Sequence, residues 1–196
     1  MPEAPGSALV AAAFAAARAE KRAALMPYMM AGFPDPEASL RIGRAYAEAG
    51  ADLIEVGVPF SDPLADGPVI HAAATAALAA GVTLEDALAI VAEGRLEAHD
   101  LIGARAAADR LLERDLLREE AHAVLIAVHG QIGSRSQVVR QHRRLQDVLR
   151  RELGEAPLPD TEAIYRQALD STMRRALERA YRLDPERTPV LVAVGR

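Results

Sequence analysis

The chain has 196 residues, enough for one ordinary domain or two small ones, and a net charge of −5 at neutral pH. It contains no cysteine, which excludes disulfides, thiolate nucleophiles and cysteine-ligated zinc. No apolar run approaches the ~20 residues that a membrane helix requires, and the charges of the Ala-rich start follow its apolar run, unlike those of a signal peptide. We therefore expect a soluble, cytoplasmic protein with no membrane partner.

The first half of the chain alternates between helical and strand-like patterns. Its predicted elements, in chain order, are a helix over 7–22 capped by Ser7, a buried strand over 25–31, a helix over 36–50, a buried strand over 52–58, a helix over 68–80 and a helix that begins at Thr83. Strand, helix, strand and helix at this spacing form the β/α repeat of a parallel sheet.

The second half reads as helical. Apolar residues recur at three- and four-residue spacing, which predicts amphipathic helices over 96–114, 117–132, 135–153 and 160–182. The helix pairs are ~34 residues long with short turns, which is typical of a TPR-like helical-repeat module. After them, only the run VLVAVG at 190–195 again has the pattern of a strand.

Charge changes at the same place as this pattern. Residues 1–94 carry 5 Lys/Arg and 12 Asp/Glu, whereas residues 95–196 carry 18 Arg and 16 Asp/Glu. A shift from −7 to +2 predicts a boundary near Gly94. The fold expected is α/β plus all-α: an α/β unit over 1–94, a helical module over 95–183 and a tail over 184–196.

Two carboxylates flank the junction between the second predicted strand and its loop, in the segment LIEVGVPFSDPLADG at 53–67. Burying Glu55 in an apolar strand costs several kcal/mol unless the group is paired or neutralised, so it either has a structural partner such as an arginine or serves proton chemistry. Asp66 lies beyond the strand, where parallel α/β folds place ligands, although an Asp in such a turn also serves as a turn former or helix cap. Two carboxylates in different environments can act as acid and base at one pH.

The segment that carries these carboxylates resembles the tryptophan synthase alpha family. The similarity extends over about residues 14–93, which include ALMPYMMAGFPDPEASLRIGRAYAEAGADLIEVGVPFSDPLADGPVIHAAATAALAAGVTLEDALAIV. It implies a (β/α)8 TIM barrel and a lyase of tryptophan biosynthesis that cleaves indole-3-glycerol phosphate to indole and glyceraldehyde 3-phosphate by a retro-aldol reaction.

The resemblance also assigns roles to single residues. Glu55 matches the family's general acid/base, Asp66 matches the residue that stabilises the indole nitrogen, and Tyr28 falls at a substrate-binding aromatic position. A tryptophan synthase beta subunit is the implied partner, with a contact at Asp62. No cofactor is expected in this chain, because pyridoxal phosphate would belong to the beta subunit.

A barrel of this kind requires about 250 residues and eight strands. This sequence supplies two barrel strands and then becomes helical, and the family's late phosphate-binding turns and closing loop have no counterpart in it. We therefore expect a truncated barrel unit whose activity is impaired.

A second resemblance covers about residues 111–169, to the bacterial transcriptional activator domain. It rests on a run of the form LREELH at 117–122, a turn that opens a helix at 133–135, and a Leu-Gly-x-x-Pro step at 153–157. In this helical segment, Val138 and His142 replace the family's small and aromatic residues. The alternative function that follows is a non-catalytic helical interaction module of a transcriptional regulator.

The histidines and arginines of the chain predict no further site. The five histidines are too scattered to predict a metal site: His71, His99, His122, His129 and His142. Arginines cluster at 140–144 and 150–151 but share their helix with acidic residues, and no aromatic residues interleave with them. A solvated helix face accounts for them better than a nucleic-acid interface, so we expect no nucleic-acid partner.

Overall fold

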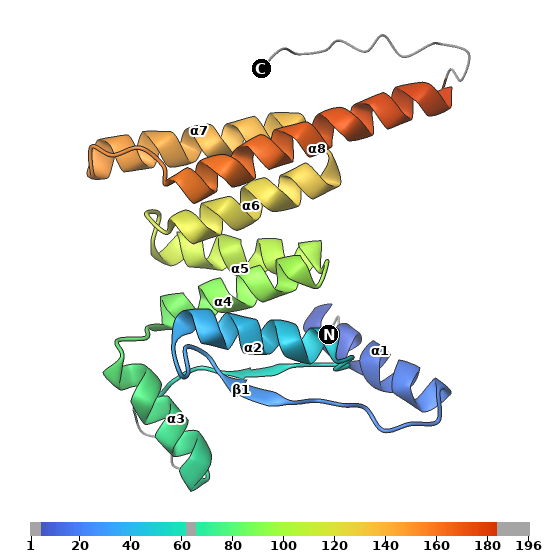
Figure 1. Cartoon of the computed structure of the whole chain (residues 1–196), viewed down its shortest axis with the longest axis vertical. Coiled ribbons are helices and arrows are strands. Elements are labelled where there is room, and N and C mark those ends of the chain that lie inside the picture. The colour runs from blue at the N-terminus through green and yellow to red at the C-terminus, as the bar shows by residue number, and fades with distance from the viewer. Residues whose placement is uncertain (1–4, 62–65, 184–196) are drawn as a thin grey trace. The chain divides into compact units, whose positions relative to one another are not determined.

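The structure is a computed structural model that describes residues 5–61 and 66–183 (Figure 1). It divides into two compact units after Asp115, and each unit is described by itself. The predicted strand at 190–195 and the predicted contact at Asp62 lie outside the described residues.

The first unit contains the predicted alternation of helices and strands. Its elements are α1 (Pro5–Ala19), β1 (Tyr28–Met30), α2 (Pro36–Glu48), β2 (Glu55–Gly57), α3 (Pro68–Ala79), α4 (Leu84–Glu97) and α5 (Leu101–Arg114). Local signals explain where helices begin: Asp35 accepts a hydrogen bond from the Ala38 amide at α2, and Thr83 forms a reciprocal capping box with Asp86 at α4. Ser7 lies inside α1, so its prediction as a cap is wrong.

The two strands pair in parallel, as predicted, with Tyr28 opposite Glu55 and Met30 opposite Gly57. Residues opposite each other in a sheet share a face, so these four point to one side of it. On this side Met30 packs against α3, in a core cluster with Ala74, Ala77 and Val82 that Tyr28 adjoins. The opposite side faces α2 and α4: Met29 lies near Gly43 of α2, and Val56 packs against Ala31, Ala87 and Ile90.

Both strands are shorter and less buried than predicted. Leu25 and Met26 precede β1 with about half of their surface exposed, and Glu55 is exposed within β2. Parallel strands are usually covered on both faces and flanked by neighbours, but this sheet has only two strands among the described residues. The prediction of buried strands is therefore wrong at these positions, because the described part of the chain supplies no further strands to cover them.

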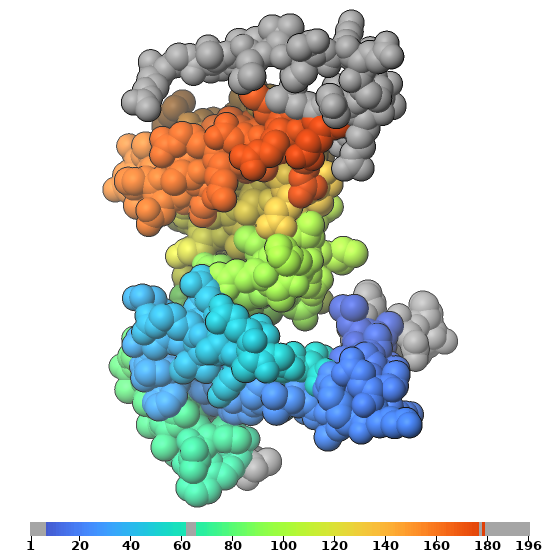
Figure 2. Space-filling model, turned by 45° about the vertical axis from the view of Figure 1, so that its right-hand side comes forward, coloured from blue at the N-terminus to red at the C-terminus, as the bar shows by residue number. Residues whose placement is uncertain are grey.

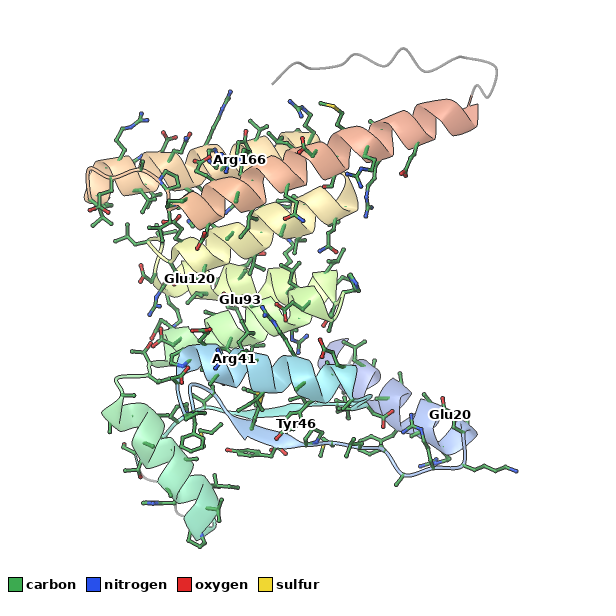
Figure 3. The ribbon with its side chains drawn as sticks, viewed as in Figure 1. Glu20, Arg41, Tyr46, Glu93, Glu120 and Arg166 are labelled. Atoms are coloured by element: carbon green, nitrogen blue, oxygen red, sulfur yellow. The ribbon has the colours of Figure 1, made fainter. Side chains whose placement is uncertain are left out.

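An ion pair connects the segment that follows α1 to the segment that precedes β2. Arg22 donates to both carboxylate oxygens of Asp52, at 2.6 and 2.7 Å, and the Leu25 amide donates to the same carboxylate at 2.8 Å. Arg22 also pairs with Glu20, labelled near the end of α1 in Figure 3. These hydrogen bonds, led by those from Arg22, hold the pKa of Asp52 at about 2.

The boundary between the compact units differs from the one that composition predicts near Gly94. Helix α5 packs against α4, and Arg114 of α5 pairs with Glu85 of α4 at 2.6 Å, which places α5 in the first unit. The charge of a segment depends on which residues lie at its surface, whereas the compact units depend on which helices pack together. This is why the two boundaries do not coincide.

The second unit consists of α6 (Glu119–Ile132), α7 (Arg135–Glu152) and α8 (Pro159–Leu183), which lie close to the predicted helices. Gly133 ends α6 in the left-handed conformation (φ 84°), as helix-terminating glycines commonly do. Ile126, Val138 and Ala168 bring the three helices together in one core. Figure 2 shows the surface of α8 in orange to red, and no strand occurs in the described part of 95–183.

Two of the scattered histidines are core residues of this unit. The side chain of His142 stacks on Tyr165 with ring centroids 3.7 Å apart and bonds Glu162 at 2.7 Å, so a ring lies at the position where the resembling family has an aromatic residue. His122 is fully buried between α6 and α7. The amide nitrogen of Gln141 donates to its Nδ1 at 2.8 Å, so its Nε2 carries the proton and donates to the Leu116 carbonyl at 3.1 Å.

This environment predicts that acid weakens the second unit. Burial lowers the pKa of His122, and the charge of Arg144 lowers it further. An unfolded histidine takes up a proton near pH ~6.5, whereas the folded one resists it, so the free energy of unfolding is complete above pH ~6.5 and falls below it by up to about 1.4 kcal/mol per pH unit. Urea unfolding followed by circular dichroism at several pH values measures this slope. His122→Gln should flatten the slope and the exposed His71→Gln should not; equal slopes in both variants would contradict the prediction.

The arginines of α7 lie on its solvent side, as predicted for a solvated helix face. Arg140, Arg143, Arg144, Arg150 and Arg151 are all exposed, as is Arg166 on α8 (Figure 3). No single helix in the described residues is long and apolar enough to cross a membrane; α3 and α4 reach that composition only as a pair bent by 107°.

Candidate functional site

The candidate site lies on the α3 side of the two-stranded sheet. Glu55 is the first residue of β2 and its side chain is exposed on this side, next to Tyr28 of β1. The expectation of a dry carboxylate inside an apolar strand is therefore not met. The side chain does lie away from α2 and α4, on the side that would face the interior if further strands closed a barrel.

Asp66 lies beyond the end of β2 and is exposed. It directly precedes Gly67, the N-cap of α3, and no side chain caps that helix. The alternative role of Asp66 as the helix cap is thus not what the structure shows. The alternative role of Asp66 as a turn former stays open beside the ligand-binding role that its place after a parallel strand predicts.

Tyr28 is the half-buried member of the site. Its ring adjoins the core cluster beneath α3. Burial raises its pKa above the ordinary tyrosine value, and the negative charges of Asp66 and Glu55 raise it further. Glu55 is opposite Tyr28 in the strand register, and the charge of Asp66 also acts on the phenol. The phenol stays protonated at neutral pH and can donate a hydrogen bond.

Two exposed carboxylates and a protonated phenol form a set suited to proton transfer and to hydrogen bonding of a small organic ligand. An aromatic ring beside them adds an apolar face on which a flat ligand can stack. Among the described residues, no group of three or more His, Asp or Glu side chains is arranged to hold a metal ion. The three side chains of the site can offer acid–base chemistry.

Sequence analysis missed one residue of this region, Gly57. A Cβ atom at Gly57 would lie 1.9 Å from the Tyr28 hydroxyl oxygen, so the phenol occupies the space where a side chain would stand. A glycine inside a predicted strand often marks such a close approach, and this signal was available at position 57. Which group approaches it depends on the strand register, which the sequence did not specify.

Curated relatives match the first part of the chain. The tryptophan synthase alpha chain of Synechocystis sp. is 58% identical over 84 residues, covering 43% of this chain and 32% of the relative. That of Synechococcus elongatus is 56% identical over 82 residues, covering 42% of this chain and 31% of the relative. The chain thus spans about a third of the length of these curated relatives. Glu55, Asp66 and Tyr28 all lie within the matched family segment, residues 14–101.

Solved structures similar to the chain belong to the same group of proteins. Tryptophan synthase from M. tuberculosis in its aminoacrylate-bound form is 34% identical, covers 63% of this chain and 58% of that chain, and has a TM-score of 0.43. The tryptophan synthase alpha subunit of Legionella pneumophila is 27% identical, covers 68% of this chain and 55% of that chain, and has a TM-score of 0.44.

Family models match both parts of the sequence, as the two resemblances predicted. Residues 14–101 match the tryptophan synthase alpha chain. Residues 62–169 match the bacterial transcriptional activator domain, so this second match begins earlier than the predicted position 111 and overlaps the first. Because it covers more than half of the sequence, the chain belongs to the bacterial transcriptional activator domain family, joined at its N-terminal part to a segment of the tryptophan synthase alpha type.

Proposed function

We propose that the first unit carries a proton-transfer site of the tryptophan synthase alpha type, impaired by the limited part of the barrel that this chain contains. The reaction is the retro-aldol cleavage of indole-3-glycerol phosphate to indole and glyceraldehyde 3-phosphate, a lyase step. One observation supports this proposal: Tyr28 and Glu55 are opposite each other in a parallel strand pair, and Asp66 follows in the loop after β2, within a segment 58% identical to an alpha chain.

The residues have separate roles in this proposal. Glu55 transfers the proton at C3 of the indole ring, and Asp66 stabilises the ring nitrogen as it gains positive character. Tyr28 binds the substrate beside them. The chain itself needs no cofactor for this step, because the chemistry is acid–base. The partner is a tryptophan synthase beta subunit, which would hold pyridoxal phosphate.

Substitution of Glu55 tests this function. In Glu55→Gln, the residual release of indole should fall to the uncatalysed level, because the amide cannot accept or return the proton. The matched control is Glu48→Gln, which removes an exposed carboxylate from α2, away from the site. Indole fluorescence after prolonged incubation at high protein concentration, with protein from a host without its own alpha chain, measures the rate. Equal rates in both variants would rule out Glu55 as the acid/base.

The second candidate function is a helical interaction module. The match of residues 62–169 to the bacterial transcriptional activator domain, together with the compact three-helix second unit, favours it. Calorimetric titration of the whole chain with a tryptophan synthase beta chain separates the two functions. The enzyme-type function predicts binding that weakens in Phe60→Ala, because Phe60 is 63% exposed at the start of the loop after β2. No binding at all would favour the module.

A further inference from the structure

Gly57 and Tyr28 are diagonal neighbours across the two strands. Tyr28 is paired with Glu55, and Gly57 lies two residues further along β2, opposite Met30. Both positions belong to the same face of the sheet, and long side chains reach such diagonal neighbours. A Cβ atom at position 57 would lie 1.9 Å from the hydroxyl oxygen of Tyr28, 2.6 Å from Cζ and 3.0 Å from Cε2. The phenol therefore lies directly over the Gly57 backbone.

The Tyr28 ring also packs against apolar side chains near α3. It adjoins the cluster of Met30, Ala74 and Ala77, which keeps it half-buried against α3. The ring is thus held between this cluster and the bare backbone of β2. Any side chain at position 57 would take the place of the phenol. Because the atoms it would meet belong to the far end of one side chain, the tyrosine can swing away while the backbone stays in place.

We propose that Gly57 is a positioning residue of the candidate site: by lacking a side chain, it lets the Tyr28 phenol lie across β2 beside Glu55 and Asp66. The phenol then presents to a ligand both an aromatic face and a hydroxyl donor, next to the two carboxylates. The naming of that ligand as an indole compound rests on the proposed function. The placement of Tyr28 by Gly57 rests on the strand register and on the close approach alone.

The direct test is the ionisation of Tyr28 in Gly57→Ala. Loss of its buried position beside two negative charges should lower the pKa of the phenol toward the ordinary tyrosine value. Ultraviolet difference titration measures this once the signal of Tyr28→Phe is subtracted, over the pH range in which circular dichroism shows the fold intact. The matched control is Gly67→Ala, in the loop that joins β2 to α3, where a Cβ atom meets nothing within 4 Å. An unchanged Tyr28 titration in Gly57→Ala would overturn the inference.

A second readout uses indole as the probe. The chain has no tryptophan, so the fluorescence of added indole is free of tryptophan background. Gly57→Ala should weaken indole binding by about threefold to tenfold, the range expected for one displaced aromatic contact. The loss should vanish when Tyr28→Ala is already present, because no ring remains to be displaced. A loss of equal size in the Tyr28→Ala background would mean that Gly57 acts without Tyr28 and would overturn the inference.

The two proposals fail in distinguishable ways. If Glu55→Gln leaves cleavage unchanged while Gly57→Ala still shifts the Tyr28 titration, the reaction is wrong and the positioning role stands. If Gly57→Ala fails to fold, the double variant with Tyr28→Ala decides. Recovery of the fold would show that the clash is with the phenol and support the inference, whereas continued misfolding would make Gly57 a purely structural residue.

Discussion

The 196-residue chain is expected to release indole from indole-3-glycerol phosphate at least about 10⁵-fold more slowly than a full-length alpha chain. Orientation of a bound substrate can supply ~7–11 kcal/mol of a reaction barrier, and each 1.36 kcal/mol corresponds to a factor of ten in rate. The resemblance implies that substrate phosphate is held by turns late in the barrel, and this sequence has no counterpart of them. Glu55 is also exposed, so water surrounds the group that must transfer the proton.

The rate comparison uses the alpha chain of Synechocystis sp. under identical conditions, with the oligomeric state of this chain determined by light scattering. If Glu55 and Asp66 are in place but nothing holds the substrate in the correct orientation, only a trace of turnover should remain. A monomeric preparation that works within a hundredfold of the full-length chain would show that the two strands and their loop suffice, and that the impaired-site proposal is wrong.

Gly130→Ala is expected to destabilise the second unit by about 1–3 kcal/mol, although alanine is the better helix former by ~1 kcal/mol. A Cβ atom at Gly130 of α6 would lie 2.7 Å from Cβ and 2.9 Å from Cα of Ala168 on α8. The second of these atoms belongs to the backbone, so no side-chain rotation relieves the contact. The two helices must separate, and the core around Ile126 and Val138 opens with them.

The matched change is Gly94→Ala in α4, where a Cβ atom meets nothing within 4 Å. It should stabilise the first unit by about 0.5–1 kcal/mol through helix propensity alone. Urea unfolding followed by circular dichroism gives both values, and hydrogen exchange of α6 and α4 amides assigns each change to its unit. Stabilisation by both substitutions would show that α6 and α8 can move apart at little cost, contrary to the packing described above.

Helices were the part of the fold that the sequence predicted well. Their limits depend on local chemistry, such as the Thr83–Asp86 capping box and the left-handed Gly133, and these signals lie within a few residues of the effect they produce. The parallel pairing of β1 and β2 followed from the same local alternation. Burial of the strands did not follow, because burial of Glu55 or Leu25 depends on neighbouring strands that the alternation assumes and that residues 5–61 and 66–183 do not supply.

The candidate site, too, could be predicted only in part from the sequence. Motif residues identified Glu55, Asp66 and Tyr28, but the contact of Tyr28 with Gly57 arises from the register of two strands that are 25 residues apart or more. The buried bond between His122 and Gln141 likewise joins residues on two helices. Residue spacing along one helix or strand cannot reveal a partner on another, so the sequence alone predicts no role for His122 or Gly57.

The ion pair between Arg22 and Asp52 has a consequence for the length of the segment between them. It closes a loop of the chain that contains β1 and α2, without a covalent bond. The entropy lost on closing a loop grows only logarithmically with its length, about 0.6 kcal/mol for each doubling. Residues added at the exposed turn around Pro34 would therefore cost the closure little, provided that Arg22, Leu25 and Asp52 keep their geometry. A longer turn at this point is thus compatible with the ion pair between Arg22 and Asp52.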